Sequence, residues 1–366
     1  MDTKYNIVII GLTLSSSWGN GHATTYRGLV RELTRQGHRV LFLEQDMPWY
    51  ANHRDLPNPH FYDFQLYSAP EDLKTRFKEE MKSADLVIVG SYVQQGVKVG
   101  TWVNNVAEGI TAFYDIDTPV TMRKLGNNDY EYLHPDLIPR YDIYLSFTGG
   151  PMLDFIETHY KSPMARALYC SVDPNIYYPE DLEKKYDLGY LGTYSEDRQP
   201  ALKKLMLDAA KRWQEGRFVI AGPNYPDSID FPANVQHIEH LPPAQHRYFY
   251  NAQRFTLNIT RADMIAAGYS PSVRLFEAAA CGIPIISDFW EGLDTLFTFN
   301  EEILIAKSKE DTLKYLTTIS ETERRNLGER ARQKVLQAHT AAHRAYELIA
   351  YLEEVTQATV KKNDRI

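Results

Sequence analysis

Short apolar runs alternate with longer helical patterns along the whole chain, an order that is typical of parallel βαβ units. A short continuous apolar run fits a strand that is buried on both faces, whereas apolar positions three and four residues apart fit a helix with one buried face. In the first half the runs predict strands at Asn6–Ile10, Arg39–Glu44, Leu86–Gly90, Ile110–Asp115, Ile143–Phe147 and Ala165–Cys170. In the second half they predict strands at Leu188–Leu191, Phe218–Ala221, Val235–Ile238, Phe255–Ile259, Ile283–Ser287 and Ile303–Ala306.

The first predicted helix has the clearest helical pattern. Tyr26, Leu29, Val30 and Leu33 recur with helical spacing, and Gly37 stands where a left-handed residue ends a helix. Further helices are expected at Gln199–Trp213, Pro242–Ala252, Pro271–Cys281 and from about Ser308 to Val355.

The pattern breaks between Ser171 and Asp187, where two prolines and a charged stretch leave no usable period. We interpret this segment as a linker between a domain at residues 1–171 and a domain at residues 172–339. A length of 366 residues also favours two domains, at about 150 residues each. The predicted fold class is α/β, with two doubly wound, Rossmann-like domains that face each other across a cleft. Ligands bind outside the carboxyl ends of strands in such sheets, so the cleft is the expected site.

The composition narrows the classes of partner and compartment. Lys and Arg number 40 and Asp and Glu number 48, so the formal net charge is −8 and no bulk positive field is available for nucleic acid. No run of about 18 apolar residues predicts a membrane span, and the start of the chain lacks the features of a signal peptide. Cys170 and Cys281 are interpreted as buried thiols in a reducing compartment. We therefore expect a cytoplasmic protein.

The loop between the first strand and the first helix holds Gly19, Asn20, Gly21 and His22. Its glycines resemble the fingerprint of a dinucleotide-binding loop. However, about ten residues separate the strand from the helix, and Thr24 occupies the position of the third glycine. Both differences disfavour a nicotinamide-dependent oxidoreductase. An imidazole at a helix N-terminus can accept a proton from a hydroxyl group. His22 is therefore a candidate catalytic base, and the alternative is that it only caps the helix.

Asp115 and Asp117 end a predicted strand as an Asp-x-Asp motif. Two carboxylates at this spacing can hold a divalent cation. The motif is far in sequence from the phosphate-binding candidates described below, so we expect no metal. Asp115 or Asp117 remains a second candidate for the base or for a contact with the substrate that carries the hydroxyl group.

The second half holds the candidates for binding phosphate. Gly192 and Thr193 end one strand, and Arg198 follows at the start of a helix. Glycine permits close approach of the backbone, and the Arg fork suits phosphate oxygens.

The strongest signal begins at Arg261, which follows another predicted strand. After it, Ser270 and Pro271 suit the start of a helix, so that the backbone N–H groups near Ser272 and Val273 would face a diphosphate. Arg274 and Glu277 follow in the same predicted helix, where Glu277 can accept hydrogen bonds from two ribose hydroxyls.

The segment Glu277–Pro284 resembles the donor helix of nucleotide-sugar glycosyltransferases of the GT-B type, in which the Glu holds the ribose. Many members carry a second Glu eight residues earlier, and Tyr269 stands there in this chain. The segments Leu191–Thr193, Leu257–Arg261 and Pro271–Glu277 look most like the spore-maturation CgeB-like branch. The resemblance implies a donor site in the second domain, an acceptor site in the first, and a last helix, 340–366, that packs back on the first domain.

We therefore predict a metal-independent glycosyltransferase that moves a sugar from a nucleoside-diphosphate sugar, its co-substrate, to a hydroxyl group of a glycan, protein or small molecule. The expected donor-site residues are Gly192, Thr193, Arg198, Arg261, Tyr269, Ser272, Val273, Arg274 and Glu277. The catalytic candidates are His22 and Asp115, and the acceptor-side loop is Gly19, Asn20 and Gly21. The alternatives are a nucleotide-sugar epimerase or phosphorylase on the same fold, and a non-catalytic sugar-nucleotide-binding protein.

Overall fold

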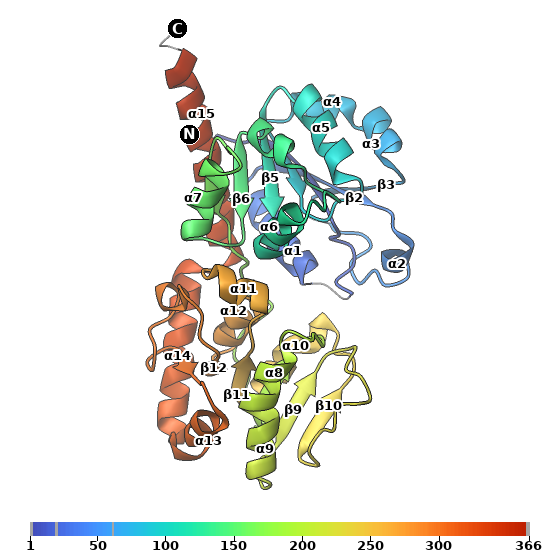
Figure 1. Cartoon of the computed structure of the whole chain (residues 1–366). Coiled ribbons are helices and arrows are strands. Elements are labelled where there is room, and N and C mark those ends of the chain that lie inside the picture. The colour runs from blue at the N-terminus through green and yellow to red at the C-terminus, as the bar shows by residue number, and fades with distance from the viewer. Residues whose placement is uncertain (1–2, 19–20, 61, 364–366) are drawn as a thin grey trace. The chain divides into compact units, whose positions relative to one another are not determined.

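Two parallel sheets organise the chain, each in its own unit, in a computed structural model that describes residues 3–18, 21–60 and 62–363 (Figure 1). The first unit comprises Met1–Cys170 and Ala341–Ile366, and the second comprises Ser171–Thr340.

The first sheet has the strand order β3-β2-β1-β4-β5-β6-β7, with every pair parallel. Its strands are β1 (Asn6–Gly11), β2 (Arg39–Gln45), β3 (Asp63–Tyr67), β4 (Leu86–Gly90), β5 (Ile110–Asp115), β6 (Ile143–Ser146) and β7 (Ala165–Ala167). The strand order reverses direction between β1 and β4. In open α/β sheets the crevice outside the carboxyl ends of such a strand pair is the usual ligand site.

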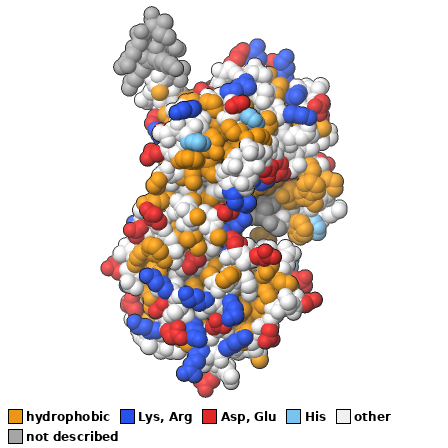
Figure 2. Space-filling view, viewed as in Figure 1, with side chains coloured by type: hydrophobic (Ala, Val, Ile, Leu, Met, Phe, Trp, Pro, Cys, Tyr) orange, Lys and Arg blue, Asp and Glu red, His pale blue; other side chains and the backbone are white. Residues whose placement is uncertain are grey.

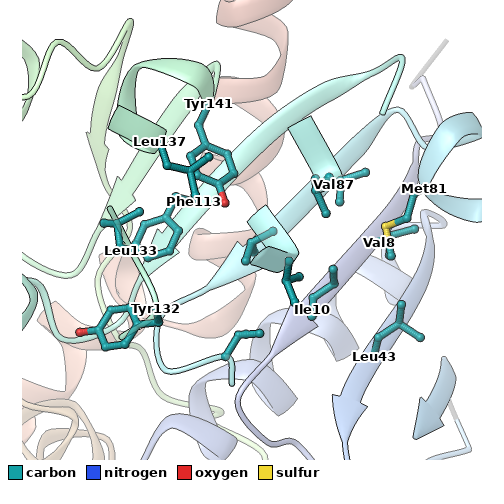
Figure 3. Close-up of a cluster of buried hydrophobic side chains, with 14 of the residues drawn as sticks. Val8, Ile10, Leu43, Met81, Val87, Phe113, Tyr132, Leu133, Leu137 and Tyr141 are labelled. Carbon is teal, nitrogen blue, oxygen red and sulfur yellow. The ribbon is translucent and has the colours of Figure 1, made fainter. Parts of the chain in front are cut away.

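Helices cover both faces of the first sheet. They are α1 (His22–Arg35), α2 (Pro48–Ala51), α3 (Pro70–Arg76), α4 (Lys78–Ser83), α5 (Gly96–Val106), α6 (Thr118–Gly126), the 3-10 helix η1 (Pro135–Arg140), α7 (Pro151–Thr158) and α15 (Ala341–Asn363). Successive residues of β1 point to opposite faces, so Ile7 and Ile9 pack with α1 and α15, whereas Val8 and Ile10 pack on the other side. Figure 3 shows this second cluster, with Tyr132 at its margin and its hydroxyl turned away from the other labelled side chains.

The second sheet has the order β10-β9-β8-β11-β12-β13 and is again parallel throughout. Its strands are β8 (Tyr186–Leu191), β9 (Phe218–Ala221), β10 (Val235–Ile238), β11 (Gln253–Asn258), β12 (Ile285–Ser287) and β13 (Leu304–Ile305). The helices are α8 (Gln199–Leu202), the π-helix η2 (Lys203–Leu207), α9 (Asp208–Arg212), α10 (Pro243–Asn251), α11 (Ala262–Ala267), α12 (Val273–Ala280), the 3-10 helix η3 (Leu293–Thr295), α13 (Lys309–Thr318) and α14 (Glu321–Ala338). Here the order reverses between β8 and β11. The predicted α/β class with two doubly wound halves is confirmed.

Two predictions of secondary structure were wrong. Strand β3 was not among the predicted strands, because its alternating, half-exposed residues carry no continuous apolar run. The single helix expected from Ser308 to Val355 is three helices, since Ser308 and Ser320 each cap a new helix start by accepting a backbone N–H three residues on.

Two surface properties bear on partners. Within the described parts of the chain, no helix is both long enough and apolar enough to cross a membrane. On the face shown in Figure 2, basic and acidic side chains intermingle over the second unit and form no field of one sign.

Candidate functional site

The start of α12 lies at the carboxyl edge of the second sheet and is held by a side chain of β11. Ser272 precedes the helix, but its hydroxyl donates to Oδ1 of Asn258 at 2.9 Å and does not cap the helix. The helix begins at Val273, two residues later than predicted, and the Ser270 hydroxyl donates to the oxygen of Gly268 at 3.0 Å. The first N–H groups of a helix lack partners within it, so this end is a favourable place for an anion.

Arg274 joins α12 to both strands at which the sheet order reverses. Its Nε donates to the main-chain oxygen of Leu191 at 2.5 Å, and its Nη1 donates to Oδ1 of Asn258 at 2.7 Å. The guanidinium also lies 5.1 Å from the centre of the Tyr190 ring. These contacts leave the residue only 9% exposed. Arg274 is therefore a buried, fixed positive charge in the first turn of α12.

Arg198 lies close enough to Arg274 and to Arg261 for their positive charges to act on it. Burial lowers the pKa of Arg198, and the positive charges of Arg274 and Arg261 lower it further. Nη2 of Arg198 donates to the oxygen of Thr193 at 2.6 Å, whereas its Nε is buried and has no hydrogen-bond partner among the described residues. Two positive charges that act on a third, buried one, which keeps an unused donor, form a site suited to an anion.

Arg261 precedes α11, whose first backbone N–H, that of Ala262, donates to Oδ2 of Asp197 at 2.9 Å. Asp197 thus connects the turn after β8 to the helix after β11. Gly192, in the same turn, donates its N–H to Ala221 at 2.8 Å and accepts from the Tyr225 hydroxyl at 3.1 Å. The predicted residues after β8 and β11 are therefore brought together in one cluster.

Glu277 lies one turn after Arg274 on α12 and is only 4% exposed. Its Oε2 accepts a hydrogen bond from the Tyr250 hydroxyl at 3.0 Å. Burial and the nearby Glu277 carboxylate raise the pKa of both Tyr250 and Tyr177 well above the usual value, so both hydroxyls stay protonated. The carboxylate is thus held by tyrosine hydroxyls, which are the same kind of donor as a ribose hydroxyl.

Tyr269 adopts a left-handed backbone conformation with φ of 47°, which is rare for a bulky residue. Its N–H donates to the oxygen of Glu291 at 2.6 Å, and its ring lies against Gly292, where a Cβ would come within 2.4 Å of the ring. Gly292 itself has φ of 89°. The loop before α12 is therefore held in a strained form by the loop after β12, and such strain is often found at functional sites.

Sequence reasoning missed Asp288, which is buried and follows β12 directly. Its Oδ2 accepts from the Thr260 N–H at 2.8 Å, and its Oδ1 accepts from the Thr260 hydroxyl at 2.7 Å. Burial raises the pKa of Asp288, and Arg274 opposes that rise. A polar residue directly after a buried strand was the signal that could have revealed it.

In the first unit, His22 is the first residue of α1 and follows Gly21, which has no side chain to cap the helix. The His22 ring stacks on Tyr92, with ring centres 5.7 Å apart and planes at 25°. His22 follows β1 and Tyr92 follows β4, so this pair lies where the first sheet reverses its strand order. The predicted acceptor residues Gly19 and Asn20 lie outside the described residues.

Asp115 is completely buried at the end of β5. It accepts hydrogen bonds from the hydroxyls of Tyr144 at 2.5 Å and Thr121 at 2.7 Å and from the N–H of Asp117 at 3.3 Å. Burial raises its pKa to about 6, although these hydrogen bonds oppose the rise. With no exposed surface in this conformation, Asp115 can influence an acceptor only through its neighbours, and Asp117 is the nearer of the two carboxylates to Tyr92.

Glu44, near the end of β2, holds the loop that precedes α1. The buried Glu44 carboxylate accepts from the N–H groups of Leu14 and Ser15 at 2.7 and 2.9 Å and from the Ser15 hydroxyl at 2.6 Å. Arg27 of α1 holds the same loop, because its Nε donates to the Leu14 oxygen at 2.7 Å while its two Nη groups donate to Asp55 at 2.8 and 2.9 Å. A dinucleotide fingerprint uses an acidic residue at the end of the second strand to bind ribose, and here that residue, Glu44, is engaged in holding the loop.

Comparisons with known proteins bear on the fold and on the class of this chain. Residues 198–350 match a family model described as "Glycosyl transferase-like". No curated protein matches the chain significantly. Sucrose-phosphate synthase from Thermosynechococcus elongatus superposes with a TM-score of 0.69 at 14% identity, covering 96% of this chain and 100% of that one.

Two further solved structures are similar over the same extent. Anabaena Alr3699/HepE in complex with UDP and glucose has a TM-score of 0.71 at 12% identity, and an alpha-glucosyltransferase in complex with UDP has 0.70 at 12% identity. Each comparison covers 96% of this chain and 100% of the other. The chain therefore has the two-domain α/β fold of GT-B glycosyltransferases. Its second unit carries a glycosyltransferase-like domain, in agreement with the enzyme class predicted from the sequence.

Proposed function

We propose that this protein transfers a glycosyl group from a nucleoside-diphosphate sugar to a hydroxyl group without the help of a metal ion. The observation that carries the proposal is the cluster of Arg198, Arg261 and Arg274 around the start of α12, at the point where the second sheet reverses its strand order. Fixed cations and free backbone N–H groups stabilise a diphosphate best when its negative charge grows during bond cleavage.

The reaction breaks the bond between the anomeric carbon and the diphosphate oxygen, and the electron pair leaves with the diphosphate. A new bond forms between the anomeric carbon and the acceptor oxygen, whose proton passes to the imidazole of His22. Proton transfer to a positioned base of this kind contributes about 10²- to 10⁴-fold to a rate. The donor residues lie in the second unit and the base in the first, so the proposed reaction requires both units.

Glu277 is proposed to bind the ribose of the nucleotide. Its carboxylate would accept hydrogen bonds from the ribose hydroxyls, either in place of those from the tyrosine hydroxyls or in addition to them. Uridine is the first base to test, because the structures of HepE and of the alpha-glucosyltransferase hold UDP. The motifs around α12 also support a place near the CgeB-like branch. A net charge of −8 argues against DNA as the acceptor, although that alpha-glucosyltransferase has been solved in complex with DNA.

Calorimetry with UDP, GDP, dTDP and ADP tests the donor site, with Arg261→Met as the variant and Arg325→Met, an exposed residue of α14, as the control. We expect one nucleotide to bind, with affinity lost in Arg261→Met and kept in the control. Binding of none of the four would refute the donor site.

Incubation of the matching nucleotide sugar with and without acceptors then separates the alternatives. Isomerised sugar from the donor alone indicates an epimerase, and consumption of the donor only with inorganic phosphate indicates a phosphorylase.

A further inference from the structure

Tyr92 occupies an unusual backbone position at the carboxyl edge of the first sheet. It lies two residues after β4 and has φ of 64°, a left-handed conformation that a tyrosine seldom adopts. The residue before it is fixed from two directions, because the N–H of Ser91 donates to Tyr114 at 2.9 Å and its hydroxyl accepts from Ile116 at 3.1 Å. The surrounding structure therefore imposes this conformation.

The Tyr92 side chain touches groups from two other strand ends. Its hydroxyl donates to Oδ2 of Asp117 at 2.8 Å, and its ring stacks on His22. The ring of Tyr132 lies 4.8 Å away, centre to centre, and the Tyr132 hydroxyl shares a hydrogen bond of 2.8 Å with Thr121. One side chain thus links the residue at the start of α1 to a carboxylate that follows β5.

The carboxylate end of this link is itself held in place. The N–H of Asp117 donates to Asp115, which also accepts from Thr121 and Tyr144. Both Asp115 and Asp117 are buried, so the acceptor of the Tyr92 hydroxyl cannot move freely. Burial of Tyr92, and after it the nearby Asp117 carboxylate, raise the pKa of Tyr92, so its hydroxyl remains a donor at neutral pH.

We propose that Tyr92 is a positioning residue for His22: its hydroxyl is fixed on Asp117, and its ring sets the orientation of the imidazole. This inference rests on the proposed function only because that function makes the His22 imidazole a catalytic base. A base must lie within hydrogen-bond distance of the proton that it removes, so a fixed ring plane beside His22 increases the rate without contacting the sugar nucleotide.

The kinetic test uses Tyr92→Phe, which keeps the ring, and Tyr92→Leu, which removes it. We expect kcat to fall about tenfold in the first and about a hundredfold in the second, while the Kd for nucleotide stays within about twofold. Tyr346→Phe is the control, because Tyr346 is 62% exposed on α15 and should behave as wild type. In a double-mutant cycle, Tyr92→Phe combined with Asp117→Asn should lose no more activity than the worse single variant. If the loss of activity in the double variant equals the product of the two single losses, Tyr92 and Asp117 act independently, and the proposed link between them is wrong.

A second readout does not depend on activity. The ring current of Tyr92 should shift the NMR resonance of the His22 ring proton, which His22→Gln assigns by its disappearance. We expect the shift to persist in Tyr92→Phe and to vanish in Tyr92→Leu. An unchanged resonance in a folded Tyr92→Leu would refute the positioning role. If the wild type binds nucleotide but transfers no sugar, the proposed function fails, and the NMR result still decides whether Tyr92 orients His22.

Discussion

Nε of Arg274 donates to the main-chain oxygen of Leu191 at 2.5 Å, so a side chain of α12 satisfies the last carbonyl of β8. Nη1 of the same guanidinium donates to Asn258, the last residue of β11, at 2.7 Å. These two strands are the pair at which the second sheet reverses its order. Arg274 therefore shapes the edge of the sheet as well as supplying positive charge to it.

Arg274→Lys should weaken both structure and nucleotide binding. A lysine retains the charge but lacks the planar fork that reaches two acceptors at once. We expect the free energy of unfolding to fall by about 1–3 kcal/mol and nucleotide affinity to fall at least about tenfold. Urea denaturation and calorimetry measure the two effects, and Arg325→Lys is the matched control. Wild-type affinity in Arg274→Lys would show that the guanidinium geometry does not matter for binding.

Glu277→Gln tests the contact with ribose while preserving the shape of the side chain. Loss of charged hydrogen bonds should reduce nucleotide affinity by about 10- to 150-fold, equivalent to about 1.5–3 kcal/mol. Glu277→Ala should in addition destabilise the fold, since the buried Tyr250 hydroxyl loses its acceptor. Calorimetry with the nucleotide that binds wild type measures the loss. An unchanged Kd in Glu277→Gln would place the carboxylate charge outside the binding site.

The raised pKa of Asp115 predicts how stability depends on pH. Between its ordinary pKa of 3.8 and about 6, the folded state binds more protons at Asp115 than the unfolded state does. Stability contributed by this group is therefore full below pH 3.8 and is lost as the pH rises towards 6, by at most about 3 kcal/mol.

Comparison of wild type with Asp115→Asn isolates this effect from other carboxyl groups. The difference in free energy of unfolding between the two proteins, measured by urea denaturation, should change between pH 4 and pH 6.5 in the direction that increasingly disfavours wild type. A difference that stays constant over this range would show that Asp115 titrates normally despite its burial.

Gly292→Ala should disturb the loop that precedes α12. Position 292 has φ of 89°, and a Cβ would lie 2.4 Å from the Tyr269 ring. We expect the free energy of unfolding to fall by about 1–3 kcal/mol and nucleotide affinity to fall with it, because Tyr269 must move. Gly126→Ala, at the end of α6, provides the control, since a Cβ there meets no atom within 4 Å. An equal free energy of unfolding in the two variants would show that the loop accommodates the added methyl group at little cost.

Local pattern predicted much of the fold because each buried strand requires an apolar run and each helix requires a repeating apolar face. The strands that hold the sites, β1, β5, β8 and β11, were predicted to within two residues at each end, and Gly37 has the left-handed φ of 91° expected of it. Strand β3 was not predicted, because an edge strand that is half exposed to solvent does not need a continuous apolar run.

The sequence by itself determined that the chain forms two parallel α/β units and that Arg198, Arg261 and Arg274 follow buried strands or begin helices. These features depend on neighbours along the chain, so their spacing is enough to reveal them. Only the tertiary structure decided which of these groups share one place and what each one contacts. The engagement of Arg274 with two strand ends and the stacking of Tyr92 on His22 join residues more than fifteen positions apart. Such contacts depend on strand order, which no local pattern encodes.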